Sequence, residues 1–259
     1  MFKIDHFAYS NNLRAVHPLE KFLFAIITML LCLIFGDIIT SLAVLALMSG
    51  CVIMLAGINW RLYVKLLTLP LSFLLVGIVA IIVSLSLQPV DFLYGFNIGR
   101  LYIGIQSGDP YVAGRLFFKA LGAVSCLYFL ALTTPMTEIF TVLRKFKVPP
   151  LFIELMELIY RFIFVLLETA GKIHLSQNSR WGYASFKSSY RSLGILLSNL
   201  FARAYWRSKI SFTALLSRGY TGNINVLQPE YNTSMKNICL IAVVDILLLL
   251  LGLYGRGII

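Results

Sequence analysis

The strongest constraint on the fold is a series of long apolar runs that carry almost no charge. A helix that crosses a bilayer needs about 20 mostly apolar residues, because the hydrocarbon core is about 30 Å thick. Five stretches meet this requirement, and they cover residues 22–36, 39–58, 66–88, 116–134 and 238–254. The first two meet at Gly36-Asp37 and are expected to form a helical hairpin. The sequence therefore predicts five transmembrane helices.

Composition supports the same fold class. Of the 259 residues, 59% are hydrophobic and 13% are charged, and the mean hydropathy is +0.86. Soluble domains are about 45–50% apolar and about 25% charged, so a soluble globular enzyme is excluded. A disordered chain is also excluded, because it could not keep so much apolar surface in water. We expect an all-α integral membrane protein.

The distribution of charge predicts the orientation in the membrane. Lys and Arg number 22 against 11 Asp and Glu, which gives a net charge of +11. Basic residues collect on the cytoplasmic side of membrane proteins, so the excess indicates topology and not nucleic-acid binding. The N-terminal segment is basic and the connection after the second run carries Arg61 and Lys65, whereas the turn at 36–40 carries no basic residue. The N-terminus is therefore predicted to be cytoplasmic and the loop at 89–112 external.

Three charged side chains lie within the apolar runs or directly before one of them. Arg115 and Lys119, near the start of the fourth run, are expected to face the bundle or to reach the membrane interface. Asp245 lies within the last run, where a carboxylate is a functional candidate by default. For Asp245 we favour a hydrogen bond between helices over a role in transport.

Residues 135–236 form a basic insertion between the fourth and fifth runs. Between positions 144 and 218 there are 12 Lys and Arg residues, and the whole insertion holds five acidic residues up to position 230. This imbalance predicts a cytoplasmic helical region. The chain is thus predicted to have three parts, an N-terminal segment with four spans, the cytoplasmic region and the last span, over residues 1–134, 135–236 and 237–259.

Within the insertion, helices are expected over 136–147, 151–178 and 189–217. The stretch 151–170 is apolar enough to resemble a sixth span. At 100° per residue, however, its charged side chains fall within an arc of about 60°, and they are Glu154, Glu157, Arg161 and Glu168. This pattern predicts an amphipathic helix at the cytoplasmic interface, with Glu157 and Arg161 at ion-pair spacing.

The helix expected over 189–217 has two different sides. Arg203, Arg207 and Arg218 lie within about 60° of one another. The opposite side carries Phe201, Tyr205, Phe212 and Leu216. We expect the aromatic side to pack on other helices, and Arg203 and Arg207 to form an outward-facing, supporting basic face.

Two helices of the insertion are predicted to end in similar short sequence motifs, called the arginine words below. The first is Ser179-Arg180-Trp181-Gly182-Tyr183, and the second is Ser217-Arg218-Gly219-Tyr220. Small residues and glycine allow a helix end to sit deep in a groove, and arginine presents a fork of donors to a carboxylate or carbonyl. An ordinary helix C-cap would use the same residue types, because arginine suits the helix dipole and glycine ends the helix. The residue types in these two motifs are therefore consistent both with docking to another protein and with simple helix capping.

No metal, nucleotide or catalytic site is predicted in this chain. The phosphate-loop pattern GxxxxGK[ST] does not occur, and the cysteines lack CxxC spacing. Histidines are not paired at ligand spacing and are assigned structural or surface roles, and these are His6, His17 and His174. We therefore expect a non-catalytic protein without a cofactor of its own.

The N-terminal words Ile4–Asn11 (IDHFAYSN) and Leu13–Lys21 (LRAVHPLEK), together with the paired arginine words, carry a family resemblance. The whole chain resembles the transmembrane (T) component of energy-coupling factor transporters, specifically the CbiQ type that serves cobalt or nickel uptake. The arginine words are similar to the two Ala-Arg-Gly motifs of that family.

The resemblance implies a membrane scaffold in the inner membrane of a bacterial cell. Its cytoplasmic coupling helices would lie across two ABC-type ATPase subunits, which bind the ATP and Mg²⁺. Their motion would pass to a separate substrate-binding membrane (S) subunit that holds the metal. A small accessory membrane subunit and membrane lipids complete the implied partners, and nucleic acid is not among them.

By the same resemblance, Arg180 and Arg218 carry the ATPase coupling. The small residues expected to permit close approach are Ser179, Gly182, Ser217 and Gly219. Serine replaces the family's alanine in both words. Trp181 is read as an insertion between Arg180 and Gly182, so the first word is expected to dock less well than the second.

Two other interpretations compete with this one. The chain could be a T component that serves a vitamin, since the S subunit would define the substrate. It could also be an integral membrane transferase of lipids or isoprenoids, but such enzymes hold Mg²⁺ with clustered aspartates, and no DxxxD or DDxxD group occurs. A self-contained channel is disfavoured by the scarcity of polar residues within the spans.

Overall fold

The computed structural model describes residues 3–82, 84–86, 92–98, 101–106, 109–220, 231 and 234–255. The chain divides into two compact units. The membrane unit comprises Met1–Val142 and Glu230–Ile259, and the α7–α8 unit comprises Leu143–Pro229. Both unit boundaries fall inside the insertion predicted at 135–236, of which residues 221–230 and 232–233 lie outside the described part.

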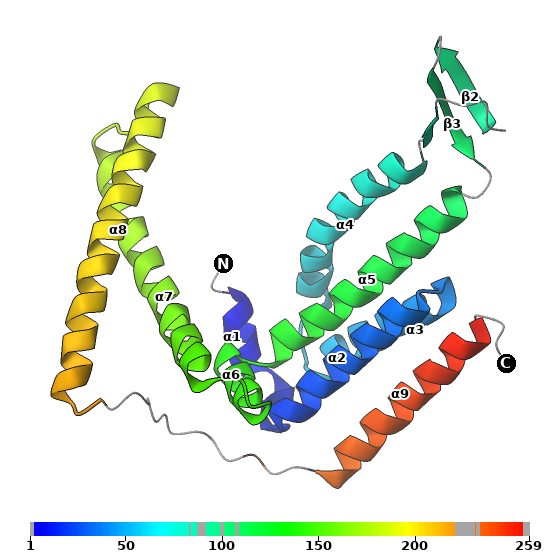
Figure 1. Cartoon of the computed structure of the whole chain (residues 1–259), viewed down its shortest axis with the longest axis horizontal. Helices are drawn as coiled ribbons and strands as arrows, with labels where there is room; N and C mark the ends of the chain where they lie inside the picture. Colours follow the sequence, from blue (N-terminus) through cyan, green and yellow to red (C-terminus); the bar gives the residue numbers. More distant parts are fainter. Residues whose placement is uncertain are drawn as a thin grey trace. The chain divides into compact units, whose positions relative to one another are not determined.

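Helices make up most of the described chain (Figure 1). The membrane unit contains α1 (Lys3–Ser10), α2 (Pro18–Phe35), α3 (Ile38–Gly50), α4 (Trp60–Ile82), α5 (Asp109–Thr133) and α9 (Met235–Gly255), with a 3₁₀ turn η1 (Asn12–Ala15) and a π turn η2 (Cys51–Leu55). The other unit contains α7 (Pro150–Ser179) and α8 (Phe186–Ser217). Helix α6 (Met136–Lys145) crosses the unit boundary.

The prediction of five spans in an all-α membrane fold is confirmed. Five helices of the described chain are long and apolar enough to cross a bilayer, and they cover Pro18–Phe35, Ile38–Leu55, Trp60–Ile82, Pro110–Thr133 and Met235–Gly255. The amphipathic helix α7 is not one of them, as its charged stripe predicts. The protein is therefore a multi-pass membrane protein.

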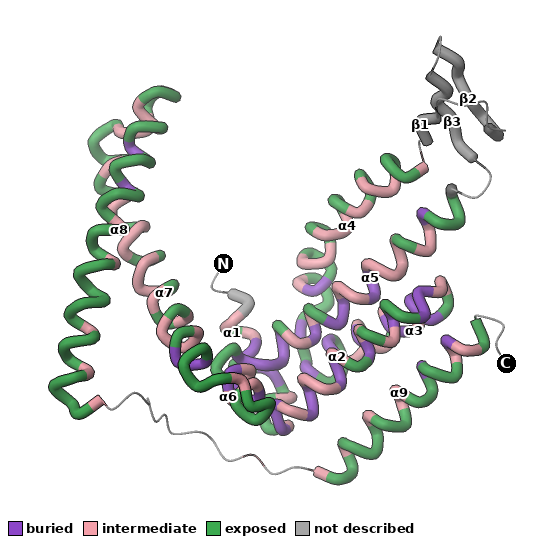
Figure 2. The backbone as a smooth tube through the Cα atoms, in the orientation of Figure 1, coloured by how far each residue is buried: buried purple, intermediate pink, exposed green. Residues whose placement is uncertain are grey.

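Helix α5 lies at the centre of the membrane unit and packs against α2, α3 and α4. Figure 2 shows the buried residues concentrated on α2, α3 and α5, whereas α4 and α9 are more exposed. Close approach of α5 depends on Gly122, where a Cβ atom would lie 2.8 Å from Cys32 Sγ and 3.1 Å from the Ser41 carbonyl oxygen. Small residues allow helices in membranes to pack closely, so Gly122 fixes the centre of the bundle.

The hairpin predicted at Gly36-Asp37 is present, and α5 completes it. Gly36 ends α2 in the left-handed conformation with a φ of 61°. Arg115 of α5 donates to the carbonyl oxygens of Gly36 (2.8 Å) and Phe35 (3.2 Å), and it pairs with Asp37 at 3.5 Å. Of the two roles expected for Arg115, the structure supports facing the bundle, because its guanidinium satisfies carbonyls that a helix end leaves unpaired.

Helix α4 continues through Pro70, and α5 compensates for the proline. Pro70 has no N–H, so the Leu66 carbonyl four residues earlier loses its helical donor. The Tyr128 hydroxyl of α5 donates to this carbonyl at 3.0 Å. A backbone group without a partner is costly in hydrocarbon, and Tyr128 thereby stabilises the packing of α4 on α5.

The connection between α4 and α5 holds three short strands that the sequence reasoning did not foresee. They are β1 (Ser84–Ser86), β2 (Phe92–Ile98) and β3 (Leu101–Gln106), and they form an antiparallel sheet in the order β1-β3-β2. Ser84 pairs with Gly104, and Ile98 pairs with Leu101. Strands β2 and β3 lie in the loop predicted at 89–112, whereas β1 lies in the last part of the run 66–88, where the third span was predicted to continue and α4 ends at Ile82. The helical class of the membrane fold is unchanged.

We expect Tyr128→Phe to destabilise the membrane unit. The change removes one hydroxyl and leaves the Leu66 carbonyl without its donor, at an expected cost of about 1–3 kcal/mol. Thermal unfolding of the detergent-solubilised protein measures this cost. Tyr111→Phe, at an exposed position early in α5, is the matched control, and equal unfolding temperatures for the two variants would contradict the role given to Tyr128.

Candidate functional site

The two arginine words lie at opposite ends of α8. Helices α7 and α8 have 30 and 32 residues and are joined at one end, where the first word forms the turn between them (Figure 1). The second word ends α8. At 1.5 Å per residue, α8 separates the two words by about 48 Å.

The first word ends α7 with a defined backbone geometry. Arg180 is the C-cap, and Trp181 adopts the left-handed conformation with a φ of 59°. The Gly182 N–H donates to the Gln177 carbonyl five residues earlier at 2.9 Å. The Ser179 hydroxyl donates to the carbonyl of Leu175 in its own helix at 3.0 Å.

The second word repeats this geometry position by position. Arg218 is the C-cap of α8, and Gly219 is left-handed with a φ of 77°. The Tyr220 N–H donates to the Leu215 carbonyl, again five residues earlier, at 3.1 Å. The Ser217 hydroxyl donates four residues back, to Thr213, at 2.9 Å.

The repeat corrects the alignment of the two words. Trp181 occupies the place of Gly219, and Gly182 occupies the place of Tyr220, so Trp181 is a substitution at the left-handed position and not an insertion. The sequence alone favoured aligning Gly182 with Gly219, because both are glycines. The backbone matches Arg180 with Arg218, and their helix ends have the same shape.

The two glycines have different surroundings. A Cβ atom on Gly182 would lie 2.8 Å from the Gln177 carbonyl oxygen and 2.9 Å from Ser192 Oγ, whereas a Cβ on Gly219 would meet nothing within 4 Å. Ser188 and Ser192 of α8 also donate to the Gly182 carbonyl, each at 2.8 Å. Gly182 therefore serves the turn between α7 and α8, and Gly219 is the glycine open to an approaching surface.

The polar ends of both words are accessible. Arg180 and Arg218 are exposed, as are Ser179, Ser217 and Gly219, and Trp181 is 81% exposed. Among the described residues, no ion pair includes Arg180 or Arg218. Each helix end thus presents an arginine whose donors are available to a carboxylate or carbonyl of another molecule.

Two tyrosines brace the helix ends, and the sequence reasoning gave them no such role. Tyr220 donates its hydroxyl to Glu154 of α7 at 2.9 Å, and this hydrogen bond raises the pKa of Tyr220. Tyr183 donates to the side chain of Gln177 at 2.8 Å and stacks at a tilt on His174. In the sequence, the tyrosine that follows the glycine of each motif could have indicated this role.

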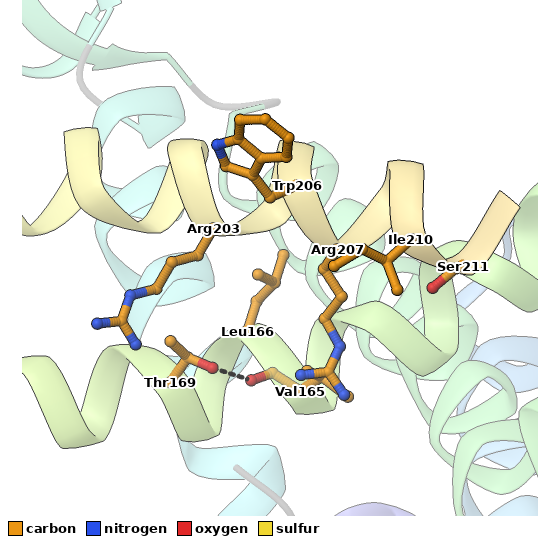
Figure 3. Close-up of a pocket in the computed structure, with 8 residues that line it drawn as sticks. All are labelled: Val165, Leu166, Thr169, Arg203, Trp206, Arg207, Ile210 and Ser211. Carbon is orange, nitrogen blue, oxygen red and sulfur yellow. Dashed lines mark hydrogen bonds between the residues drawn. The ribbon is translucent and has the colours of Figure 1, made fainter. Parts of the chain in front are cut away.

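The aromatic side of α8 is not packed on other helices as expected, and the exposed side chains of Arg203 and Arg207 lie on the side of α8 next to α7. Arg203 and Arg207 line a groove of about 510 Å³ with Val165, Leu166 and Thr169 of α7. Figure 3 shows both guanidinium groups directed toward α7 and the indole of Trp206 directed away. The opposite side, expected to pack on helices, is exposed instead, and it comprises Phe201, Tyr205, Phe212 and Leu216.

Charges along α7 form exposed pairs. Glu157 pairs with Arg144 of α6 at 3.2 Å, where helical spacing predicted Arg161 as its partner. Glu168 pairs with Lys172 at 2.7 Å, and the hydrogen bond and positive charge of Lys172 lower the pKa of Glu168. Exposed pairs contribute little to stability, so these pairs orient side chains more than they hold the fold.

The remaining candidates lie in the membrane unit. The Asp245 Oδ1 atom of α9 is buried without a hydrogen-bond partner in the described chain, so the expected bond between helices is not observed at this atom. His17 Nδ1 accepts the Leu19 N–H at 3.0 Å and begins α2. The residues described include no group of three or more His, Cys, Asp or Glu side chains placed to hold a metal ion.

A bundle of helices long and apolar enough to cross a bilayer, joined in sequence to two long, arginine-ended helices, defines a multi-pass helical membrane protein. Residues 10–230 match the model of the CbiQ family, described as cobalt transport protein. The chain belongs to this family.

Three relatives are similar in sequence to this chain over most of its length. The chain is 36% identical to an uncharacterized protein of Methanocaldococcus jannaschii over 253 residues, which are 96% of this chain and 92% of the relative. It is 31% identical to the cobalt transport protein CbiQ of Salmonella typhimurium, over 87% of this chain and all of that protein. A putative fused cobalt transport protein CbiMQ of Methanocorpusculum labreanum is 32% identical over 96% of this chain and 41% of the fused protein.

We expect Gly182→Ala to destabilise the α7–α8 turn more than Gly219→Ala does. The first change places a methyl group against a carbonyl, at about 1–3 kcal/mol. The second strains a left-handed residue, at about 1–2 kcal/mol. Gly194→Ala in α8, with open space around it, is the control and should be neutral or stabilising. Hydrogen exchange over residues 177–192 measures the turn, and protection of Gly182→Ala equal to that of the control would contradict its packing role.

Proposed function

We propose that this protein is the transmembrane coupling (T) subunit of an energy-coupling factor transporter that imports cobalt or nickel. The observation that carries the proposal is the pair of helix ends with matching geometry, each with an exposed arginine, at the two ends of α8. Family membership supplies the transport context. Two similar ends about 48 Å apart suit two copies of one partner.

ABC-type ATPases are the proposed partners at these ends. Each helix end would insert into a groove of one ATPase, with Arg180 or Arg218 donating to carboxylate or carbonyl oxygens there. Arginine suits this contact because its planar fork binds two acceptors at once. A continuous helix of 32 residues resists bending, so closure of the ATPases would move both ends together.

The subunit itself is proposed to be non-catalytic. The chain lacks a phosphate-loop pattern, and ATP and Mg²⁺ would be bound by the ATPase subunits. Lys and Arg outnumber Asp and Glu in the insertion, which supports a cytoplasmic location for the α7–α8 unit. The basic residues Arg61 and Lys65, against none in the turn at 36–40, support a cytoplasmic N-terminus.

A second membrane subunit would hold the metal and receive the motion. The fused relative supports this, because its name joins CbiM to CbiQ and our chain covers only 41% of it. Helices α4 and α9 expose large apolar side chains to their surroundings. These surfaces would face lipid, the substrate-binding (S) subunit or a small accessory membrane subunit.

Substitution of the two arginines tests the proposal. Because the two ends share one geometry, Arg180→Ala and Arg218→Ala should each weaken binding of the ATPases by roughly tenfold or more, the scale of an arginine hot spot, and the double variant should lose cobalt uptake. Co-purification with the ATPase subunits and uptake by reconstituted vesicles are the measurements.

Arg61→Ala is the matched control, since Arg61 is an exposed arginine of the membrane unit that stacks on Trp60 at 5.8 Å. It should assemble and transport as the unaltered protein does. Normal ATPase binding and cobalt uptake by the double variant Arg180→Ala/Arg218→Ala would remove the proposed coupling role.

A further inference from the structure

A buried polar cluster lies at the start of α2 in the membrane unit. Glu20, Lys21 and Glu138 are 3%, 3% and 8% exposed. Burying charged side chains has a large desolvation cost, and well-packed apolar residues often serve stability as well or better. Three buried charges at one place therefore point to a requirement for specific geometry.

The cluster fixes the chain where it leaves the membrane unit toward α7. Lys21 of α2 pairs with Glu138 of α6 at 3.5 Å and donates to the Thr133 carbonyl, at the end of α5, at 3.1 Å. Glu138 lies shortly before the unit boundary at Leu143. The departing segment is thereby attached to both α2 and α5, the helices at the centre of the bundle.

The same cluster fixes the chain where it returns. Tyr231 follows the boundary at Glu230 and donates its hydroxyl to Glu138 Oε1 at 2.6 Å. Three to six residues further on, the Ser234 N–H and the Asn237 side chain donate to the two oxygens of Glu20 at 3.1 and 3.2 Å. Glu138, which belongs to the departing segment, thus contacts the returning segment through Tyr231 and α2 through Lys21.

We propose that this junction cluster (Glu20, Lys21, Glu138 and Tyr231) is where movement of the α7–α8 unit is transmitted to the membrane helices. The inference rests on the proposed coupling function. Glu138 and Tyr231 act as positioning residues, because they hold both connections of the α7–α8 unit against the first turn of α2. A displacement carried by either connection then moves α2 and α5, and is not absorbed by the connecting segments.

The junction stays intact over the physiological pH range. Burial and the neighbouring carboxylate of Glu138 raise the pKa of Tyr231 to about 12. The phenol therefore remains protonated and donates to Glu138 at every pH at which the transporter would work. Tyr231→Phe removes this donor while it keeps the ring that contacts His17 edge-on.

The test uses the complete complex with its ATPases and substrate-binding subunit. In Tyr231→Phe, assembly and ATP hydrolysis should stay within about twofold of the unaltered complex, while cobalt imported per ATP hydrolysed should fall roughly tenfold, the scale of one hydrogen bond to a charged group. Glu138→Met, which removes the acceptor of the Tyr231 hydroxyl at similar side-chain length, should show the same loss. The double variant should be no worse than the poorer single variant, because both changes break one link.

Tyr111→Phe, on an exposed position of α5, is the matched control and should keep normal coupling. Unchanged cobalt per ATP in Tyr231→Phe would overturn the inference and leave the proposed function standing. So would a parallel loss of hydrolysis, uptake and thermal stability, which is the signature of a purely structural role. Cobalt uptake by the unaltered protein without ATPases would remove the proposed function and this inference with it.

Discussion

The fold depends on one physical requirement, that no backbone N–H or C=O group be left without a partner inside the bilayer. Helices satisfy it along each span, and side chains satisfy it where helices end or contain proline. Arg115 binds the carbonyls at the end of α2, and Tyr128 binds the carbonyl that Pro70 frees in α4. Both side chains belong to α5, which is why this helix organises the bundle.

Outside the spans, the exposed side chains indicate where the protein contacts other molecules. The membrane unit buries charged residues at the junction cluster, whereas the α7–α8 unit exposes its arginines and an entire aromatic side of α8. A long helix with uncovered apolar and cationic surface is incompletely buried as a single chain. This property fits a component of an assembly, and the family membership gives that assembly a role in transport.

Much of this could be predicted from the sequence, since span length and charge are local properties. The five spans and the absence of a span at α7 followed from hydropathy and the charged stripe. The orientation of α8 could not be predicted, because helical phase separates two sides without saying which one meets α7. The match of Trp181 with Gly219 was also hidden, because a left-handed tryptophan has no sequence signature. Contacts such as Tyr231 with Glu138 join positions 93 apart, and no local pattern reveals them.

The central claim is that both arginine-ended helix termini contact ATPase subunits. Photo-crosslinking groups placed at positions 181 and 219 in the assembled complex test it most directly, with Leu247, an exposed residue of α9, as the control position. We predict that each terminus crosslinks to one ATPase subunit and that position 247 crosslinks to none. Crosslinks from neither terminus, or ATPase crosslinks from position 247 alone, would contradict the account.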